Sequence, residues 1–190
     1  MGSKMNTREK ILTTAAFLFQ KNGYHATGLN EIIKESGTPK GSLYYYFPNG
    51  KEELVAATIK LMGEKIQHQI EEELAKNSDP VQAFKEFILD LARDFNEKDQ
   101  ENCFSISLLA LETVSMSESL RKTCIEVYDL WTEMYYHKLV DSGFSSEKAT
   151  ELSSILQLMI EGAITISLIR NDTTMLVAAA EKIPILLDNN

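Results

Sequence analysis

The sequence predicts an all-α protein of about nine helices. Strand signals are nearly absent, because no run of alternating β-branched residues is bounded by turn residues such as Asn-Gly. Apolar residues instead recur at helical spacing along most of the chain. With 44% hydrophobic residues, nine glycines and four prolines among 190 residues, the composition is that of a globular chain able to bury a core.

Three helices are predicted within the first 47 residues. Asn6 and Glu9 form a capping box that opens the first helix. Thr27 is placed as the N-cap of the second helix, and Thr38, which precedes a proline, as the N-cap of a short third helix. Pro48 disfavours helical geometry at the residue before it and so ends the third helix.

Six longer helices follow. A second capping box, formed by Asn49 and Glu52, opens a helix that runs through about residue 74. Asp79 caps the next one, and the apolar periodicity predicts helices over 80–96, 102–114, 117–141, 146–169 and 173–187. We therefore expect a three-helix domain over residues 1–50 and a larger helical domain over residues 51–190.

Charge is distributed unevenly along the chain. The net charge of −9 by itself argues against nucleic-acid binding. Residues 1–51, however, hold seven Lys/Arg against three Asp/Glu, whereas residues 52–190 hold twelve against twenty-five. A basic N-terminal quarter is thus joined to an acidic body.

The cysteines and the apolar segments bear on the cellular compartment. Cys103 and Cys124 both lie in apolar helical segments and are expected to be reduced thiols. No apolar run reaches the roughly 18 residues that a membrane helix needs, and Glu161 interrupts the longest. We expect a cytoplasmic protein without a membrane partner.

The third predicted helix and the turn before it match a helix-turn-helix plan, in which the last helix lies in the DNA major groove. Residues 44–47 are four consecutive aromatics, and on a helix these cannot all face one core. Leu43 and Phe47, four residues apart, are expected to pack inward. The residues left facing outward are Lys40, Gly41, Ser42, Tyr44 and Tyr45.

Two lysines favour DNA over an ordinary surface. Lys40 and Lys51 each lie in the first turn of a helix, where the helix dipole disfavours a cation but where free N–H groups and a lysine together bind phosphate well. Gly41 permits a close backbone approach, and the hydroxyls of Tyr44 and Tyr45 can donate to phosphates. The alternative is that these tyrosines line a domain interface.

The run FLFQKNGYHATGLNEIIKESGTPKGSLYYYFPNGKEEL resembles the DNA-binding domain of TetR-family transcriptional repressors. The resemblance implies double-stranded operator DNA as partner, and a symmetric dimer would read it as a palindrome. It also implies DNA contacts at Thr27, Thr38, Lys40, Gly41, Ser42, Tyr44, Tyr45 and Lys51.

Three later segments, LLALET, SESLRKTC and MIEG, resemble the LmrA-like branch of Gram-positive repressors. Some members of that branch respond to flavonoids and control efflux or detoxification genes. The resemblance therefore implies a ligand-responsive repressor whose larger domain binds an effector.

A cavity for a small apolar or aromatic effector would use aromatic side chains and a few polar groups. Glu112 and Glu161 lie inside apolar runs, so each is either satisfied by a helix partner or offered to a ligand. The candidates for the lining are Phe84, Phe87, Leu91, Phe104, Leu108, Leu111, Trp131 and Tyr135.

Enzyme signatures are missing from the sequence. The three histidines are far apart and lack the spacing of metal ligands, and we find no nucleophile elbow, phosphate-binding glycine loop or paired catalytic carboxylates. We expect no enzymatic activity, no cofactor and no metal.

The last two predicted helices are the expected homodimer interface, because they carry long apolar stripes. The stripes consist of Ile155, Leu158, Met159, Ile166 and Ile169, and then Leu176, Ala179, Ala180, Ile183 and Leu187. Two alternatives stay open: an effector-free helical DNA-binding dimer, and a helical binding module without DNA activity.

Overall fold

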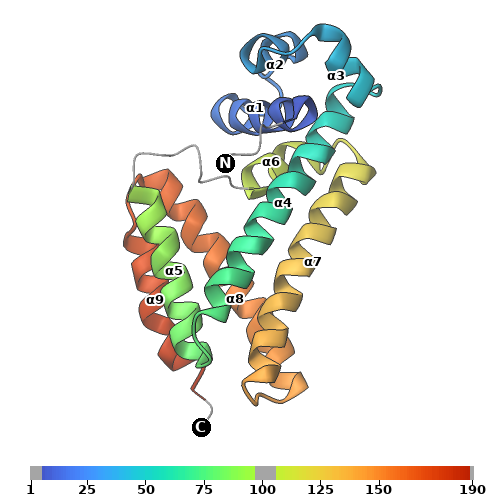
Figure 1. Ribbon diagram of the computed structural model, residues 1–190. Coiled ribbons are helices and arrows are strands. Elements are labelled where there is room, and N and C mark those ends of the chain that lie inside the picture. Colours follow the sequence, from blue (N-terminus) through green and yellow to red (C-terminus); the bar gives the residue numbers. More distant parts are fainter. Residues whose placement is uncertain (1–5, 97–105, 189–190) are drawn as a thin grey trace. The chain divides into compact units, whose positions relative to one another are not determined.

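The computed structural model describes residues 6–96 and 106–188, which contain nine α-helices and no strand (Figure 1). The all-α prediction is confirmed. The predicted limits agree closely with the observed ones, although the predicted helix over 102–114 begins outside the described residues. The helices are α1 (Thr7–Asn22), α2 (Leu29–Ser36), α3 (Lys40–Tyr46), α4 (Lys51–Ala75), α5 (Pro80–Asn96), α6 (Ile106–Thr113), α7 (Glu118–Asp141), α8 (Ser146–Arg170) and α9 (Thr174–Leu186).

The described residues form two compact units. The first combines the chain up to Glu64 with the stretch from α6 to Val127, and the second contains the remainder. Both α4 and α7 therefore contribute to both units. The division into functional domains at residue 50 stays a prediction, because compactness does not assign function.

In the first unit, α2 and α3 pack against α1 (Figure 1). A helix as short as α3 is marginal by itself, so its seven residues depend on the side chains that they bury. Leu43 and Phe47 are both buried, as predicted. The core that they join includes Ile11, Leu12, Ala15, Phe19, Ile32, Leu54 and Ile59.

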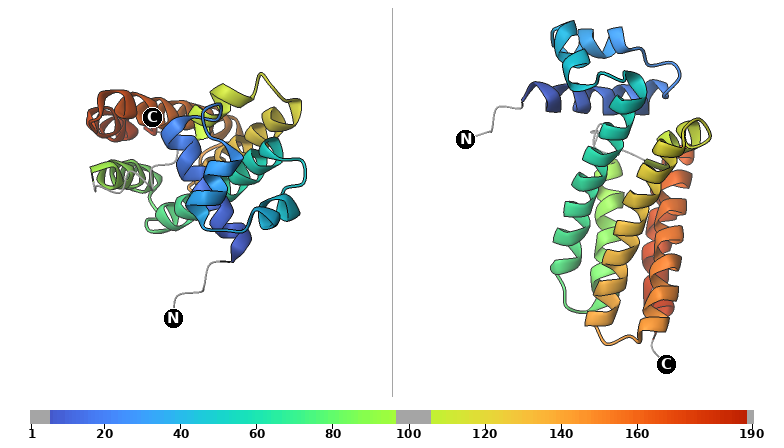
Figure 2. Two further views of the ribbon diagram at one scale, coloured as in Figure 1. Left: turned by 90° about the horizontal axis from the view of Figure 1, so that it is seen from above. Right: turned by 90° about the vertical axis from the view of Figure 1, so that its right-hand side faces the viewer.

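In the second unit, α9 packs against α5 and α8 (Figures 1 and 2). This packing corrects one prediction: the α9 stripe assigned to a dimer interface is buried within the chain itself. It consists of Leu176, Ala179, Ala180, Ile183 and Leu187. The apolar period located a buried face, but it did not say which element covers that face.

The α8 stripe differs from the α9 stripe. Leu158, Ile166 and Ile169 are exposed, and Ile155 and Met159 are partly exposed. These positions are separated by three, four or seven residues, apart from the adjacent Leu158 and Met159, and so follow one side of the helix.

Helix α8 also corrects the expectation that no segment is long enough to span a membrane. Its 25 residues include an 18-residue stretch with a mean hydropathy of 1.7, of which 33% is buried. By length and composition α8 meets the requirement for a span. A core helix of a soluble protein meets the same requirement, so this is weak support for a membrane segment.

Two of the predicted helix starts are confirmed. The side chain of Asn6 accepts a hydrogen bond from the Glu9 N–H at 2.8 Å and opens α1. The carboxylate of Asp79 accepts from the N–H groups of Val81 and Gln82, both at 3.3 Å, and opens α5.

Three other predicted caps are wrong in detail. Gly28 occupies the N-cap of α2, and Pro39 that of α3, with no side-chain cap in either case. The hydroxyls of Thr27 and Thr38 therefore bond elsewhere, as described below. At the start of α4, the Asn49 N–H donates to Glu53 at 2.9 Å, whereas Glu52 accepts from Ser117.

Candidate functional site

Helix α3 presents an aromatic and basic surface to solvent. Its inward side is fixed by the buried Leu43, and Phe47 is buried just after its end. Tyr45 is 79% exposed, and Tyr44 is also exposed. The ammonium group of Lys40 lies 5.9 Å from the centre of the Tyr44 ring. A cation and two exposed rings thus share one short helix, on which Gly41 is also exposed and Ser42 partly exposed.

Tyr46 lies at the edge of this surface. Its ring meets the Tyr45 ring edge-on, with centroids 5.0 Å apart, and lies 6.4 Å from the Phe47 ring. Tyr46 therefore links the exposed Tyr45 to the buried Phe47 and helps to hold Tyr45 in place.

Lys51, the first residue of α4, lies against the loop that follows α1. Its Nζ atom is 4.2 Å from the centre of the Tyr24 ring and donates a hydrogen bond to the His25 carbonyl at 3.4 Å. Burial lowers the pKa of Lys51, and the Glu112 carboxylate acts in the opposite direction. The ammonium group is thus partly desolvated and held by Tyr24 and His25 at the N-terminus of a helix, an arrangement suited to a phosphate.

Two threonines predicted to contact DNA have buried side chains. Thr27 is 0% exposed, and its hydroxyl donates to the carbonyls of Leu18 at 3.0 Å and Gly23 at 2.8 Å. Thr38 is buried, and its hydroxyl pairs with that of Ser36 at 2.8 Å. Both hydroxyls therefore bond within the protein and hold the loops on either side of α2 in place.

The effector candidates fall into two groups. Phe84, Phe87 and Tyr135 lie together in the second unit, with ring centroids 5.5 and 6.4 Å from Tyr135. Trp131 is buried in the same unit, and Leu91 there is partly exposed. Leu108 and Leu111 belong to the first unit, and Leu111 is 75% exposed. Phe104 lies outside the described residues.

Comparison with protein families matches both parts of the chain. Residues 11–58 match the bacterial regulatory proteins of the tetR family, and residues 80–182 match the C-terminal domain of LmrA/YxaF-like transcriptional regulators. The chain belongs to the TetR family. The family resemblance and the branch predicted from the sequence are both confirmed.

Named members of the family cover nearly the whole chain. The HTH-type transcriptional regulator YxaF of Bacillus subtilis (strain 168) is 46% identical over 187 residues, which is 98% of each chain. LmrA of the same strain is 42% identical over 96% of this chain and 97% of its own. QacR of Staphylococcus aureus is 28% identical over 85% of this chain and 86% of its own. These TetR-family relatives are all helix-turn-helix transcriptional regulators.

Solved structures agree with the TetR-family fold. Reduced NemR of Escherichia coli has a TM-score of 0.84 over 97% of this chain and all of its own, at 20% identity. A TetR regulator from Legionella pneumophila has a TM-score of 0.80 over 97% of this chain and 98% of its own, at 23% identity.

The two carboxylates of this TetR-family chain that lie within apolar runs both have protein partners. Glu112 accepts hydrogen bonds from the backbone N–H groups of Tyr24 at 2.7 Å and His25 at 3.4 Å. Glu161 accepts from the Tyr128 hydroxyl at 3.3 Å and from the Gln157 amide at 3.5 Å. Glu161 thus has the helix partners of the first alternative, whereas the partners of Glu112 lie in the loop that follows α1.

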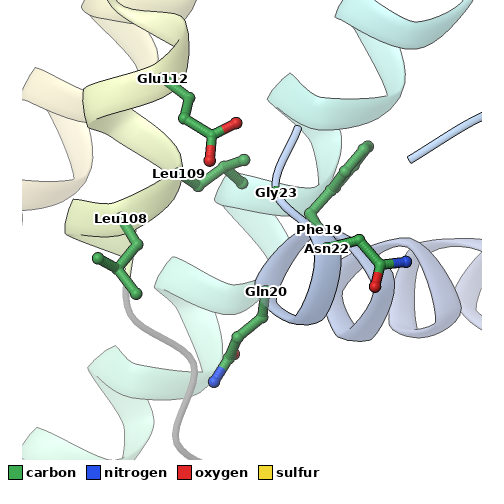
Figure 3. Close-up of a pocket in the computed structure, with 7 residues that line it drawn as sticks. All are labelled: Phe19, Gln20, Asn22, Gly23, Leu108, Leu109 and Glu112. Atoms are coloured by element: carbon green, nitrogen blue, oxygen red, sulfur yellow. The ribbon is translucent and has the colours of Figure 1, made fainter. Parts of the chain in front are cut away.

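Glu112 also lines a cleft that no sequence pattern indicated (Figure 3). Its volume is about 210 Å³, below the roughly 300–1,000 Å³ typical of sites for drug-sized ligands. Among the effector candidates that the structure describes, only Leu108 lines it. The lining residues are Phe19, Gln20, Asn22, Gly23, Leu108, Leu109 and Glu112.

Proposed function

We propose that this TetR-family regulator is a cytoplasmic repressor that binds a palindromic DNA operator as a homodimer and is released by a small apolar or aromatic effector. Its family membership supports the regulatory role, and the relatives named above are transcriptional regulators.

The DNA assignment is carried by one observation: exposed Tyr44 and Tyr45 share α3 with Lys40, while Lys51 lies at the start of the next helix. Buried Leu43 sets which side of α3 faces outward. Side chains at the N-terminal end of such a helix read base edges, and Lys51 at a helix N-terminus suits a backbone phosphate.

Fluorescence anisotropy with labelled duplexes tests the assignment. We expect Tyr45→Ala to weaken binding, because an exposed ring and hydroxyl leave the contact surface. Lys148→Ala is the matched control, since Lys148 is a cation in the second unit that pairs with Glu151 at 3.2 Å. Equal affinities for wild type, Tyr45→Ala and Lys148→Ala would contradict the assignment of α3.

The homodimer is supported by the exposed apolar side of α8. Leu158 and Ile169 are 74% and 79% exposed, and Ile166 lies between them. A Cβ atom built at Gly162, in the middle of the stripe, meets nothing within 4 Å, so the surface there is open. A contiguous apolar stripe of this kind on a regulator fits association with a second copy, which would also double the operator site.

An effector site in the second unit is supported by its aromatic core. Trp131 meets Tyr128 edge-on at 5.3 Å, and burial followed by the Glu161 charge raises the pKa of Tyr135, which keeps its hydroxyl neutral. Within the described residues the buried Oε1 atom of Gln157 has no hydrogen-bond partner. An aromatic ligand with a donor group would satisfy that oxygen while stacking on the rings.

A further inference from the structure

The loop that follows α1 is held by a residue 88 positions away in the sequence. Gly23 ends α1 with φ +81°, and the next two residues, Tyr24 and His25, point their N–H groups at Glu112 on α6. The stronger of the two bonds, from Tyr24, is 2.7 Å long. A carboxylate acceptor makes such bonds roughly twice as strong as a neutral one does.

The same two loop residues hold Lys51. The ring of Tyr24 lies under the ammonium group, and the carbonyl of His25 accepts its hydrogen bond. Glu112 thus binds the backbone of the residues whose other groups bind Lys51. Its charge also acts on Lys51 directly, because it raises the lysine pKa against the effect of burial.

Two features of Gly23 require a glycine beside the Glu112 carboxylate. Its positive φ strains any residue with a Cβ atom. A Cβ atom at this position would also come within 2.7 Å of Glu112 Oε1, closer than real Cβ contacts come (Figure 3). The space that the carboxylate occupies therefore depends on the glycine at the end of α1.

We propose that Glu112 is a positioning residue for operator binding. It holds the Tyr24–His25 loop so that Lys51 meets the DNA phosphate in its binding geometry. The proposal rests on the repressor function proposed above. It makes α6 part of the DNA-reading apparatus, although α6 lies outside residues 1–50, and any displacement of Glu112 then lowers operator affinity.

Substitutions at Glu112 separate the effect of its side-chain length from the effect of its charge. Glu112→Gln keeps an acceptor oxygen in the same place, whereas Glu112→Asp keeps the charge but is one methylene too short. We expect operator affinity to fall about tenfold for Glu112→Ala and Glu112→Asp, and about threefold for Glu112→Gln, as for loss and weakening of a charge-assisted hydrogen bond. Glu118→Gln is the matched control, because Glu118 pairs with Arg121 on the surface of the same unit.

A double variant tests whether Glu112 acts through Lys51. If it does, Glu112→Ala combined with Lys51→Ala binds operator within about twofold of Lys51→Ala alone, because the two losses are coupled. If the affinity losses of the two single variants multiply in the double variant, the two residues act independently and the proposal is overturned. It is also overturned by Glu112→Ala and Glu112→Asp variants that bind operator like wild type, or by a Gln variant weaker than the Asp variant.

Amide hydrogen exchange without DNA distinguishes this proposal from the repressor function itself. We expect the Tyr24 amide to exchange at least about tenfold faster in Glu112→Ala than in wild type or Glu118→Gln. If the wild type binds no duplex specifically but the exchange difference is seen, the repressor function is refuted and the contact of Glu112 with the loop still stands. Unchanged exchange would refute the contact. If the Ala variant does not fold, the comparison of Gln with Asp decides.

Discussion

The ammonium group of Lys51 lies 4.2 Å from the centre of the Tyr24 ring, so the first cation of α4 is held by the loop that ends α1. Two elements separated by α2 and α3 in the sequence are joined at the position where a phosphate is expected. A lysine held in advance loses less side-chain entropy on binding than a free one.

Replacing Lys51 should weaken binding without changing which sequence is preferred. We expect Lys51→Ala to lower affinity for all duplexes by a similar factor and to reduce the slope of log K against log salt by about one, as for one lost phosphate contact. Anisotropy titrations at several salt concentrations measure both. An unchanged salt slope would show that Lys51 does not contact phosphate.

Replacing Lys40 should, in contrast, change how well the protein discriminates between DNA sequences. Lys40 is exposed in the first turn of α3, where a side chain reaches base edges. We expect Lys40→Ala to reduce discrimination between operator and single-base variants of it, at a cost of about 1–3 kcal/mol for the contacted base. Affinities measured for a panel of operators with single-base changes test this expectation. A uniform loss across the panel would reassign Lys40 to a phosphate.

Thr27 should matter for stability. Its buried hydroxyl donates to two carbonyls at the end of α1, so Thr27→Val leaves both without that donor. We expect the free energy of unfolding to fall by about 1–3 kcal/mol, and Thr27→Ser, which keeps the hydroxyl, to lose less. Urea denaturation measures this. A Val variant of unchanged stability but weakened operator binding would restore the prediction of a DNA contact.

Charges on α8 and α9 should have different effects. Leu158→Asp and Ile169→Asp place a charge on an exposed stripe, so we expect folded monomers that have lost tight operator binding. Ala180→Asp buries a charge in the chain's own core, and we expect it to unfold. Sedimentation and circular dichroism separate the two outcomes, with Thr150→Asp as control. A monodisperse wild-type monomer at micromolar concentration would refute the dimer.

Induction should be visible at Trp131, the only tryptophan of the chain. An apolar or aromatic inducer bound among the aromatic residues of the second unit should change its fluorescence, and Trp131→Phe should abolish the signal. Because coupling is reciprocal, operator DNA should lower inducer affinity by the factor by which inducer lowers DNA affinity, commonly 5–150-fold. If no apolar compound shifts melting or operator affinity, the effector-free dimer becomes the better account.

The helices could be predicted from the sequence because their signals are local. Asn6 and Asp79 bond within three residues of themselves, and apolar spacing repeats within each helix. The outward side of α3 followed from Leu43 and Phe47 by the same local argument. These predictions needed no knowledge of what each helix packs against.

The predictions that failed depended on long-range contacts. The hydroxyl of Thr27 could cap α2 or bond back to α1, and only the packed structure selects the second. The stripe on α9 looked identical whether α5 or a second copy covered it. The position of Glu112 in an apolar run indicates that it needs a partner, but that partner lies 88 residues away and has no sequence signal.

The central claim is sequence-specific binding by a pair of α3 helices, and selection from randomised duplexes by purified wild-type protein tests it most directly. We expect enrichment of an inverted repeat whose half-site centres lie about 34–36 Å apart, or a multiple of that distance. We also expect the same selection with Lys40→Ala to yield a flatter motif. Recovery of no motif by wild type, or of a single site without a repeat, would contradict the account.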